Sequence, residues 1–397
     1  MDIGAFESPV ASLPAPTDLT PSGVTAASAG YDTPVFNWNA GAGADHYDLV
    51  VVDNNKGTAP IMIQSISGTS YATTTAQAFT PGHSFTTYLY AFSADDLTYG
   101  FATQSFALAA LSAPTGITPG GAFPASAGYD RPTFNWTDPG ADYYSLKVVD
   151  NTTHTTPIAV SNIRGTSYAT TAAQALTPGH SYTTYVDAFS TNGNVNVLAA
   201  QTFTLSLLAA PTGITPRGVV TPSAGYDEPT FNWNAVAGAD HYTLVVVDNT
   251  TGATPIIVRN LGGTSYSSTA TQALTPGHKF TIRVYAYSTS GNAYSFGTQS
   301  FTLAPLTAPT LGPPSGTVAT SPLSFTWPQV PGADHYFLLV VDDTAKAVII
   351  KISNIAVNSF ILSVPLISKH KYTWRVAAVA ANNIFAIWST SENFTIT

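Results

Sequence analysis

Asp45, His46 and Tyr47 stand side by side in the stretch GADHYDLVVVDN, which runs from Gly43 to Asn54. A carboxylate beside an imidazole can orient the ring, so that the ring acts as a general base in catalysis. The same residues could instead form the start of a β-strand. The sequence around them has to decide between these two interpretations.

The stretch is one of four similar copies along the chain, and this argues against catalysis. In the second copy Tyr143 takes the place of His46, and a general base cannot become tyrosine without that copy losing its chemistry. We therefore interpret Asp45 as a turn residue and His46 as an exposed strand residue. Four further histidines stand before a later strand and are interpreted as turn residues: His83, His180, His278 and His370.

One tryptophan marks each copy, and the spacing between copies is 98, 97 and 94 residues: Trp38, Trp136, Trp233 and Trp327. This period predicts four domains of about 100 residues each. Their bounds are 14–111, 112–208, 209–306 and 307–397, after a leader at 1–13. Copies one to three also carry an added SAGYD motif, beginning at Ser28, Ser126 and Ser223, which copy four lacks.

Alternation with period two predicts β-strands, most clearly in the second copy at Tyr143–Asp150, Ser181–Phe189 and Ala200–Leu207. No stretch keeps a period of 3.6 residues, so we expect little helix. About seven short strands in each copy predict an antiparallel β-sandwich. The proline-bearing joints Leu111–Pro119 and Leu208–Pro216 are short, which predicts a semi-rigid rod of four such domains.

Two motifs of the fourth copy, FTWPQVPGADHYFLLVV from Phe325 and KYTWRVAAVA from Lys371, resemble fibronectin type III and related immunoglobulin-like modules. The resemblance extends from about Ala15 to Thr397. It implies an all-β fold of tandem sandwiches, in which the two strands that carry these motifs are neighbours in one sheet. It implies little about function, because this fold serves many unrelated roles.

A second, shorter resemblance lies in the leader. The segment DIGAFE, Asp2–Glu7, is similar to the closing segment of bacterial surface proteins built as a right-handed parallel β-helix. It implies that the chain is the C-terminal stalk of a larger secreted protein. The leader Met1–Leu13 could also add a strand to the sheet edge of a neighbouring copy.

The composition excludes several classes of function. The chain has 22 acidic and 13 basic residues, a net charge of −9, and only 9% charged residues against about 25% in ordinary domains. Basic residues are few and scattered, so we expect no nucleic-acid partner. The absence of cysteine excludes disulfides, Cys-zinc sites and thiol catalysis. No apolar stretch reaches 18 residues, so we expect no membrane span in this chain.

Period two also separates the faces of each strand. In the GADHY strand of copy one, Tyr47, Leu49 and Val51 should face the core, and Phe85, Thr87, Leu89 and Ala91 should do so in the strand after PGH. The outward residues are either ordinary exposed strand residues, since tyrosine is common there, or a candidate interaction surface for a partner protein, a second copy or a sugar: Tyr88, Tyr90, Phe92, Tyr185, Phe189, Tyr285, Tyr287, His335, Phe337 and Leu339.

Asparagines in Asn-x-Ser/Thr sequons are candidate glycosylation sites: Asn135, Asn151, Asn249 and Asn393. The Thr-rich stretch Thr69–Gln77 could carry O-linked sugars. Recurring aspartates leave structural calcium open, although no EF-hand spacing exists. No other cofactor, catalytic or metal site is predicted.

From these features we expect a non-enzymatic extracellular protein of structural or adhesive type, self-associating as a subunit of a surface fibre or stalk. The alternative is a carbohydrate-binding or spacer region of a secreted polysaccharide-degrading enzyme, in which the aromatic residues stack on sugar rings.

Overall fold

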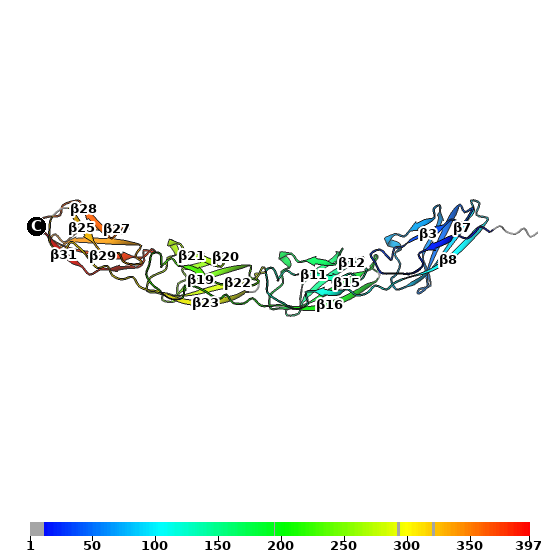
Figure 1. The fold of residues 1–397 in the computed structure, drawn as a ribbon, viewed down its shortest axis with the longest axis horizontal. Coiled ribbons are helices and arrows are strands. Elements are labelled where there is room, and N and C mark those ends of the chain that lie inside the picture. The colour runs from blue at the N-terminus through cyan, green and yellow to red at the C-terminus, as the bar shows by residue number, and fades with distance from the viewer. Residues whose placement is uncertain (1–11, 194, 292–293, 320–321) are drawn as a thin grey trace, which may run out of the picture. The chain divides into compact units, whose positions relative to one another are not determined.

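The computed structural model describes residues 12–397 except 194, 292–293 and 320–321, and the leader segment 1–11 lies outside the described residues. The described chain is all-β, as predicted. Its only helical elements are three single 3₁₀ turns, η1 (Thr75–Gln77), η2 (Ala172–Gln174) and η3 (Ala270–Gln272). The chain forms two compact units, one of residues 1–124 and 131–206, the other of residues 125–130 and 207–397. Figure 1 colours the strands along the chain.

In repeat 1 (residues 14–111) two sheets enclose the core. The smaller has the order β1 (Thr17–Thr20), β3 (Val35–Asn39), β6 (Ser70–Ala72). The larger has the order β2 (Gly23–Thr25), β8 (Tyr99–Leu108), β7 (Ser84–Phe92), β4 (His46–Asp53), β5 (Thr58–Ile66). The pairing is antiparallel throughout, except that β2 runs parallel to β8. As the resemblance implied, β4 and β7 are neighbours.

Repeat 2 (residues 112–208) has the same two sheets. They are β9 (Thr115–Thr118), β11 (Thr133–Thr137), β14 (Ser167–Ala169), and β10 (Gly121–Phe123), β16 (Asn196–Leu205), β15 (Ser181–Phe189), β12 (Tyr143–Asp150), β13 (Thr155–Ile163). The predicted strands Tyr143–Asp150 and Ser181–Phe189 have these bounds. The strand predicted at Ala200–Leu207 is instead β16, which begins at Asn196 because it pairs with β15 along that strand's whole length.

In repeats 3 and 4 (residues 209–306 and 307–397) the smaller sheet has two strands and the order of the larger sheet is kept. Repeat 3 consists of β18 (Thr230–Asn232), β21 (Ser265–Ser267), and β17 (Gly218–Val220), β23 (Tyr294–Leu303), β22 (Lys279–Tyr287), β19 (His241–Asp248), β20 (Ile256–Leu261). Repeat 4 consists of β25 (Leu323–Thr326), β28 (Ser359–Leu362), and β24 (Gly316–Val318), β31 (Glu392–Ile396), β29 (Lys371–Val379), β26 (His335–Asp342), β27 (Ala347–Ile355), with β30 (Ala386–Trp388) on β29.

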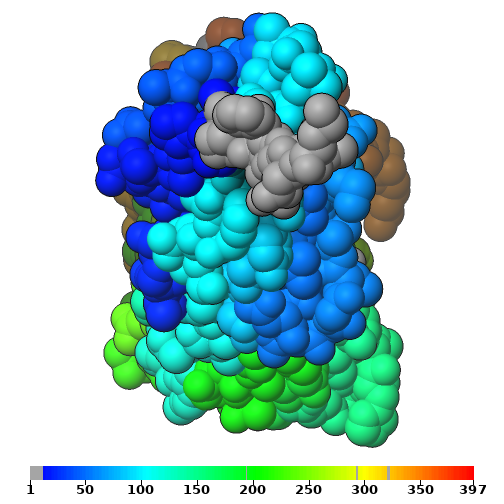
Figure 2. Space-filling view, turned by 90° about the vertical axis from the view of Figure 1, so that its right-hand side faces the viewer, coloured from blue at the N-terminus to red at the C-terminus, as the bar shows by residue number. Residues whose placement is uncertain are grey.

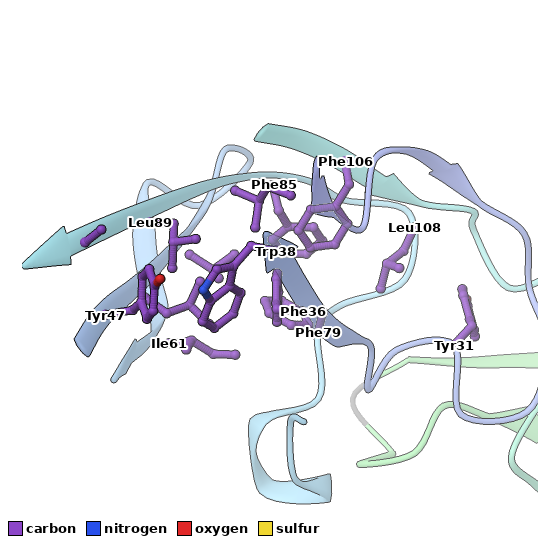
Figure 3. Close-up of a cluster of buried hydrophobic side chains, with 14 residues drawn as sticks. Tyr31, Phe36, Trp38, Tyr47, Ile61, Phe79, Phe85, Leu89, Phe106 and Leu108 are labelled. Carbon is purple, nitrogen blue, oxygen red and sulfur yellow. The ribbon is translucent and has the colours of Figure 1, made fainter. Parts of the chain in front are cut away.

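The core of repeat 1 lies between its two sheets and is rich in aromatic rings (Figure 3). Trp38 of β3 meets Tyr47 of β4 edge to face, with 5.3 Å between ring centroids. Phe79 and Phe85 pack in the same way at 4.7 Å. All seven residues predicted to face inward on β4 and β7 are at most 3% exposed. The predicted faces are therefore confirmed for these strands.

An aspartate–histidine pair fastens each repeat at one end of the larger sheet. In repeat 2 the Asp150 carboxylate ends β12 and accepts a hydrogen bond from His180 Nδ1 at 2.7 Å, just before β15. The same carboxylate accepts the amides of Thr152 and Thr153 in the hairpin turn. The counterparts are Asp53–His83, Asp248–His278 and Asp342–His370, at 2.9, 2.8 and 2.7 Å. We call these four pairs the clamps.

The clamps give the turn histidines a structural role. Burial, the largest single influence, acts to raise the pKa of Asp150, but the hydrogen bonds from His180, Thr152 and Thr153 outweigh it and hold that pKa below its ordinary value. The pKa of Asp53, Asp248 and Asp342 is lowered for the same reasons. A carboxyl with a lowered pKa in the folded state stabilises the fold above its unfolded pKa of about 3.9.

We expect Asp150→Asn to lower the free energy of unfolding by about 1–3 kcal/mol at pH 7, because the charge and the Oδ2 acceptor that faces His180 Nδ1 are lost, while the amide oxygen of asparagine can still accept the two turn amides. The deficit should shrink as the pH falls through the lowered pKa, where the wild-type carboxylate is protonated. Urea unfolding at pH 7 and pH 3 measures both effects. Asp45→Asn is the control, since Asp45 is 59% exposed beside His46. An equal effect of the two substitutions at pH 7 would contradict the clamp.

Candidate interaction surface

Four aromatic rings gather on the outer face of the larger sheet of repeat 1. Tyr90 and Phe92 of β7 lie opposite Phe101 and Tyr99 of β8, respectively. The ring centroids are 5.9 Å apart for Tyr90–Phe101 and 6.1 Å for Phe92–Tyr99. Tyr99 and Phe101 are each 54% exposed, and the cyan segment that contains β8 reaches the surface in Figure 2. We call these four residues the first aromatic cluster.

A shallow hollow of about 230 Å³ adjoins this cluster. Its walls include Tyr90 and Phe92, together with Asp48 of β4 and Met62 and Gln64 of β5. The Met62 side chain is 65% exposed. The hollow therefore combines an aromatic wall with one carboxylate from β4, the neighbour of β7, and one amide from β5, the next strand in the sheet.

Repeat 3 carries a second aromatic cluster of the same construction. Tyr285 and Tyr287 of β22 lie opposite Phe296 and Tyr294 of β23. The ring centroids are 5.3 and 5.4 Å apart, respectively. Tyr294 and Phe296 are 57% and 51% exposed. Sequence reasoning found the β7 and β22 members but missed the β8 and β23 members, although these also alternate with period two.

Repeat 2 has only part of such a surface. Phe189 lies against Tyr143 with 4.9 Å between centroids and nearly parallel planes. Tyr185 lies opposite Ala200, and Leu198, at the position of Phe101, contributes no ring. The predicted residues Tyr185 and Phe189 are half-buried, and they lie on the outer face.

The outer face of repeat 4 differs from the prediction. His335 was expected to face outward, but it is only 8% exposed. Phe337 and Leu339 are half-buried. Phe337 packs edge to face on Trp388 of β30, at 5.3 Å, and the Arg375 guanidinium lies 4.3 Å from the Trp388 ring centroid. The chain's own tryptophan and arginine thus cover part of the face that the sequence indicated as bare.

The Asp-His-Tyr stretch that suggested catalysis has a packing role. The His46 ring stacks on Phe92 at 5.4 Å, and its Nδ1 lies 3.3 Å from Asp45. In repeat 3, His241 stacks on Tyr287 in the same way, at 5.0 Å. In repeat 2 the Tyr143 ring occupies this position. Both histidine and tyrosine rings stack on the facing aromatic residue there, which explains why the two interchange.

The four sequon asparagines, Asn135, Asn151, Asn249 and Asn393, are all exposed. Asn151 and Asn249 directly follow the clamp aspartates at the ends of β12 and β19. Their side chains hydrogen-bond to neighbouring hydroxyl groups, for example Asn249 Nδ2 to Thr281 Oγ1 at 2.9 Å. Glycosylation at these positions stays a prediction.

Among the described residues, no group of three or more histidine, aspartate or glutamate side chains could hold a metal ion. In the same part of the chain no helix is long and apolar enough to cross a membrane. The recurring aspartates that had left calcium open lie in the clamps or in the SAGYD motifs.

Comparison with known proteins gives no family: no protein-family model and no curated protein matches the chain. Solved structures do match.

The FN1–FN3 domains of chicken CNTN1 are 15% identical, with 72% of this chain and 99% of that chain covered and a TM-score of 0.22. A two-domain fibronectin type III segment of chicken tenascin is 18% identical, with 47% and 97% covered and a TM-score of 0.24. Immunoglobulin domains 1–5 of Sidekick-1 are 13% identical, with 97% and 80% covered and a TM-score of 0.28. Similarities of this strength carry no functional argument.

We expect the exposed rings to contribute little to folding. Tyr99→Ser with Phe101→Ser should change the free energy of unfolding by less than about 1 kcal/mol, because both side chains are more than half exposed. Phe106→Ala, on the same strand but 2% exposed, should cost about 3–5 kcal/mol. Chemical denaturation measures both changes. A large loss in the double variant would mean that the cluster supports the fold rather than a partner.

Proposed function

We propose that this chain is a non-enzymatic extracellular protein of structural or adhesive type, which associates with copies of itself through the aromatic clusters of repeats 1 and 3. The observation that carries the proposal is the recurrence of four partly exposed rings on the same outer sheet face. Tyrosine and phenylalanine are enriched at the centres of protein interfaces, because large rigid rings bury much area at low entropic cost.

The charge content supports association as well. Only 9% of residues are charged, so copies of the chain repel one another weakly. Contiguous exposed apolar patches of this kind mark interaction sites more often than chance. An extracellular location accords with the exposed sequons and with a Thr- and Ser-rich surface that attached sugars would cover.

Replacing the β8 and β23 rings should abolish this association. Tyr99→Ser, Phe101→Ser, Tyr294→Ser and Phe296→Ser together should leave the protein monomeric at concentrations where the wild type forms oligomers or fibres. Sedimentation velocity and electron microscopy over a range of concentrations measure this. The control is Val24→Ser with Val219→Ser, since these valines are 73% and 67% exposed but lie outside both clusters. A monomeric wild type at every concentration would overturn the proposal.

A second candidate function is carbohydrate binding at repeat 1. The hollow beside the first aromatic cluster favours it, because rings can stack on a sugar while the Asp48 carboxylate and the Gln64 amide accept or donate hydrogen bonds to hydroxyl groups. On a glycan array, binding that is lost in Tyr90→Ala but retained in Tyr285→Ala would assign the hollow as a sugar site. The absence of binding on a broad array would exclude this second function.

A further inference from the structure

The SAGYD motif of repeats 1–3 forms a hydrogen-bonded turn that holds a buried aspartate. Asp32, Asp130 and Asp227 are at most 2% exposed. In repeat 1 the Tyr31 amide donates to Ser28 O at 3.0 Å, and the Tyr31 hydroxyl donates to Ala109 O at 2.9 Å, just after β8. In repeat 3 the Tyr226 hydroxyl donates to Ala304 O at 3.1 Å. The tyrosine thus fixes its turn to the end of its own repeat.

Within the first unit, the Asp32 carboxylate reaches the following repeat. It accepts the Thr191 amide at 2.9 Å, and the Thr191 hydroxyl also donates to it. Asp142, the aspartate of the GAD turn in repeat 2, accepts the Gly30 amide at 2.8 Å. A Cβ on Gly140 would lie 2.5 Å from the Ala27 carbonyl carbon, so only glycine allows this approach.

The second unit contains counterparts of the contact between Asp32 and the Thr191 amide. The Asp227 carboxylate accepts the Ala381 amide at 2.9 Å, in the turn between β29 and β30. A Cβ on Gly332, in the GAD turn of repeat 4, would lie 2.7 Å from the Tyr226 ring. The segment 125–130 also belongs to this unit, and there Asp130 accepts the Ser290 amide at 2.9 Å.

Buried carboxylates need such partners. Burial raises the pKa of Asp32, partly offset by the hydrogen bonds from Thr191, and burial likewise raises the pKa of Asp227. A carboxylate taken out of water without donors costs several kcal/mol. The amide that the next repeat supplies therefore offsets part of the cost of burying the aspartate.

We propose that the SAGYD turns of repeats 1 and 3 are docking sockets for the repeat that follows within the same unit. The socket recognises a backbone amide in the turn after β15 or β29 of that repeat, and the glycine of its GAD turn. Repeat 4 has no SAGYD motif and hence no socket. In repeat 1 the turn that would enter a socket carries Asp95 and Asp96, where repeat 2 has Asn192 and Gly193. These two carboxylates would repel the socket aspartate.

The two outer repeats are thus unsuited to joining one another by this contact. If the proposed self-association occurs, it has to use other surfaces, such as the aromatic clusters. The docking socket does not depend on the proposed self-association, because it is inferred from contacts between repeats of one chain.

Asp142 and Asp45 form a matched pair for the test, since they occupy the same GAD position but only Asp142 meets a socket. In the full chain, Asp32→Ala and Asp142→Ala should each speed hydrogen exchange of the Thr191 or Gly30 amide at least tenfold. Repeats 1 and 2 should then tumble independently in ¹⁵N relaxation measurements. Asp45→Ala should change neither. Unaltered exchange and joint tumbling in Asp32→Ala would overturn the proposal.

A gain-of-contact experiment tests the two outer repeats, in the background of Tyr99→Ser, Phe101→Ser, Tyr294→Ser and Phe296→Ser. Residues 26–33 replace residues 319–322, which gives repeat 4 a socket. Adding Ala94→Thr, Asp95→Asn and Asp96→Gly to this graft should produce end-to-end oligomers, whereas the graft alone should stay monomeric. Monomers in both proteins, with native unfolding temperatures, would overturn the docking role. Equal oligomers in both would overturn the role of Asp95 and Asp96.

Discussion

In each repeat, one face of the larger sheet packs its apolar side chains against the smaller sheet. The register between the two central strands of the larger sheet depends on this packing. In repeat 1, β4 and β7 pair along eight residues, from His46 opposite Phe92 to Asp53 opposite Phe85. A slip of one residue would carry Leu49 and Val51 from the core into water. The apolar side chains thus hold the register, and the register decides what the outer face presents.

The aromatic clusters are a direct consequence of this constraint. Once β7 and β8 are in register, Tyr90 must lie beside Phe101 and Phe92 beside Tyr99. The same register in repeat 2 brings Asp187 opposite Leu198, so no cluster forms there. The same strand pairing therefore presents different surfaces in the two repeats, because the outward positions carry different side chains.

The chain has few charged residues, and several of its aspartates are buried. In the clamps, the carboxylate collects donors from its own repeat, a histidine and two turn amides. In the sockets, the carboxylate of Asp32 or Asp227 finds its donors in the repeat that follows. In both settings, backbone amides satisfy a negative charge that burial would otherwise make costly. The clamps stabilise each repeat internally, and the sockets couple a repeat to its successor.

By itself, the sequence determined the repeat period, because the tryptophan motif recurs at nearly constant spacing. It also determined the all-β fold and the inward faces of the central strands, because these depend on local alternation within each strand. It also placed Tyr90, Phe92, Tyr285 and Tyr287 on the outer face. The tertiary structure decided which distant residues meet. His180 reaches Asp150 from 30 residues away, Thr191 reaches Asp32 from 159 residues away, and Trp388 covers Phe337. Pairings over such separations follow from strand order and from the contact of successive repeats, which no local pattern encodes.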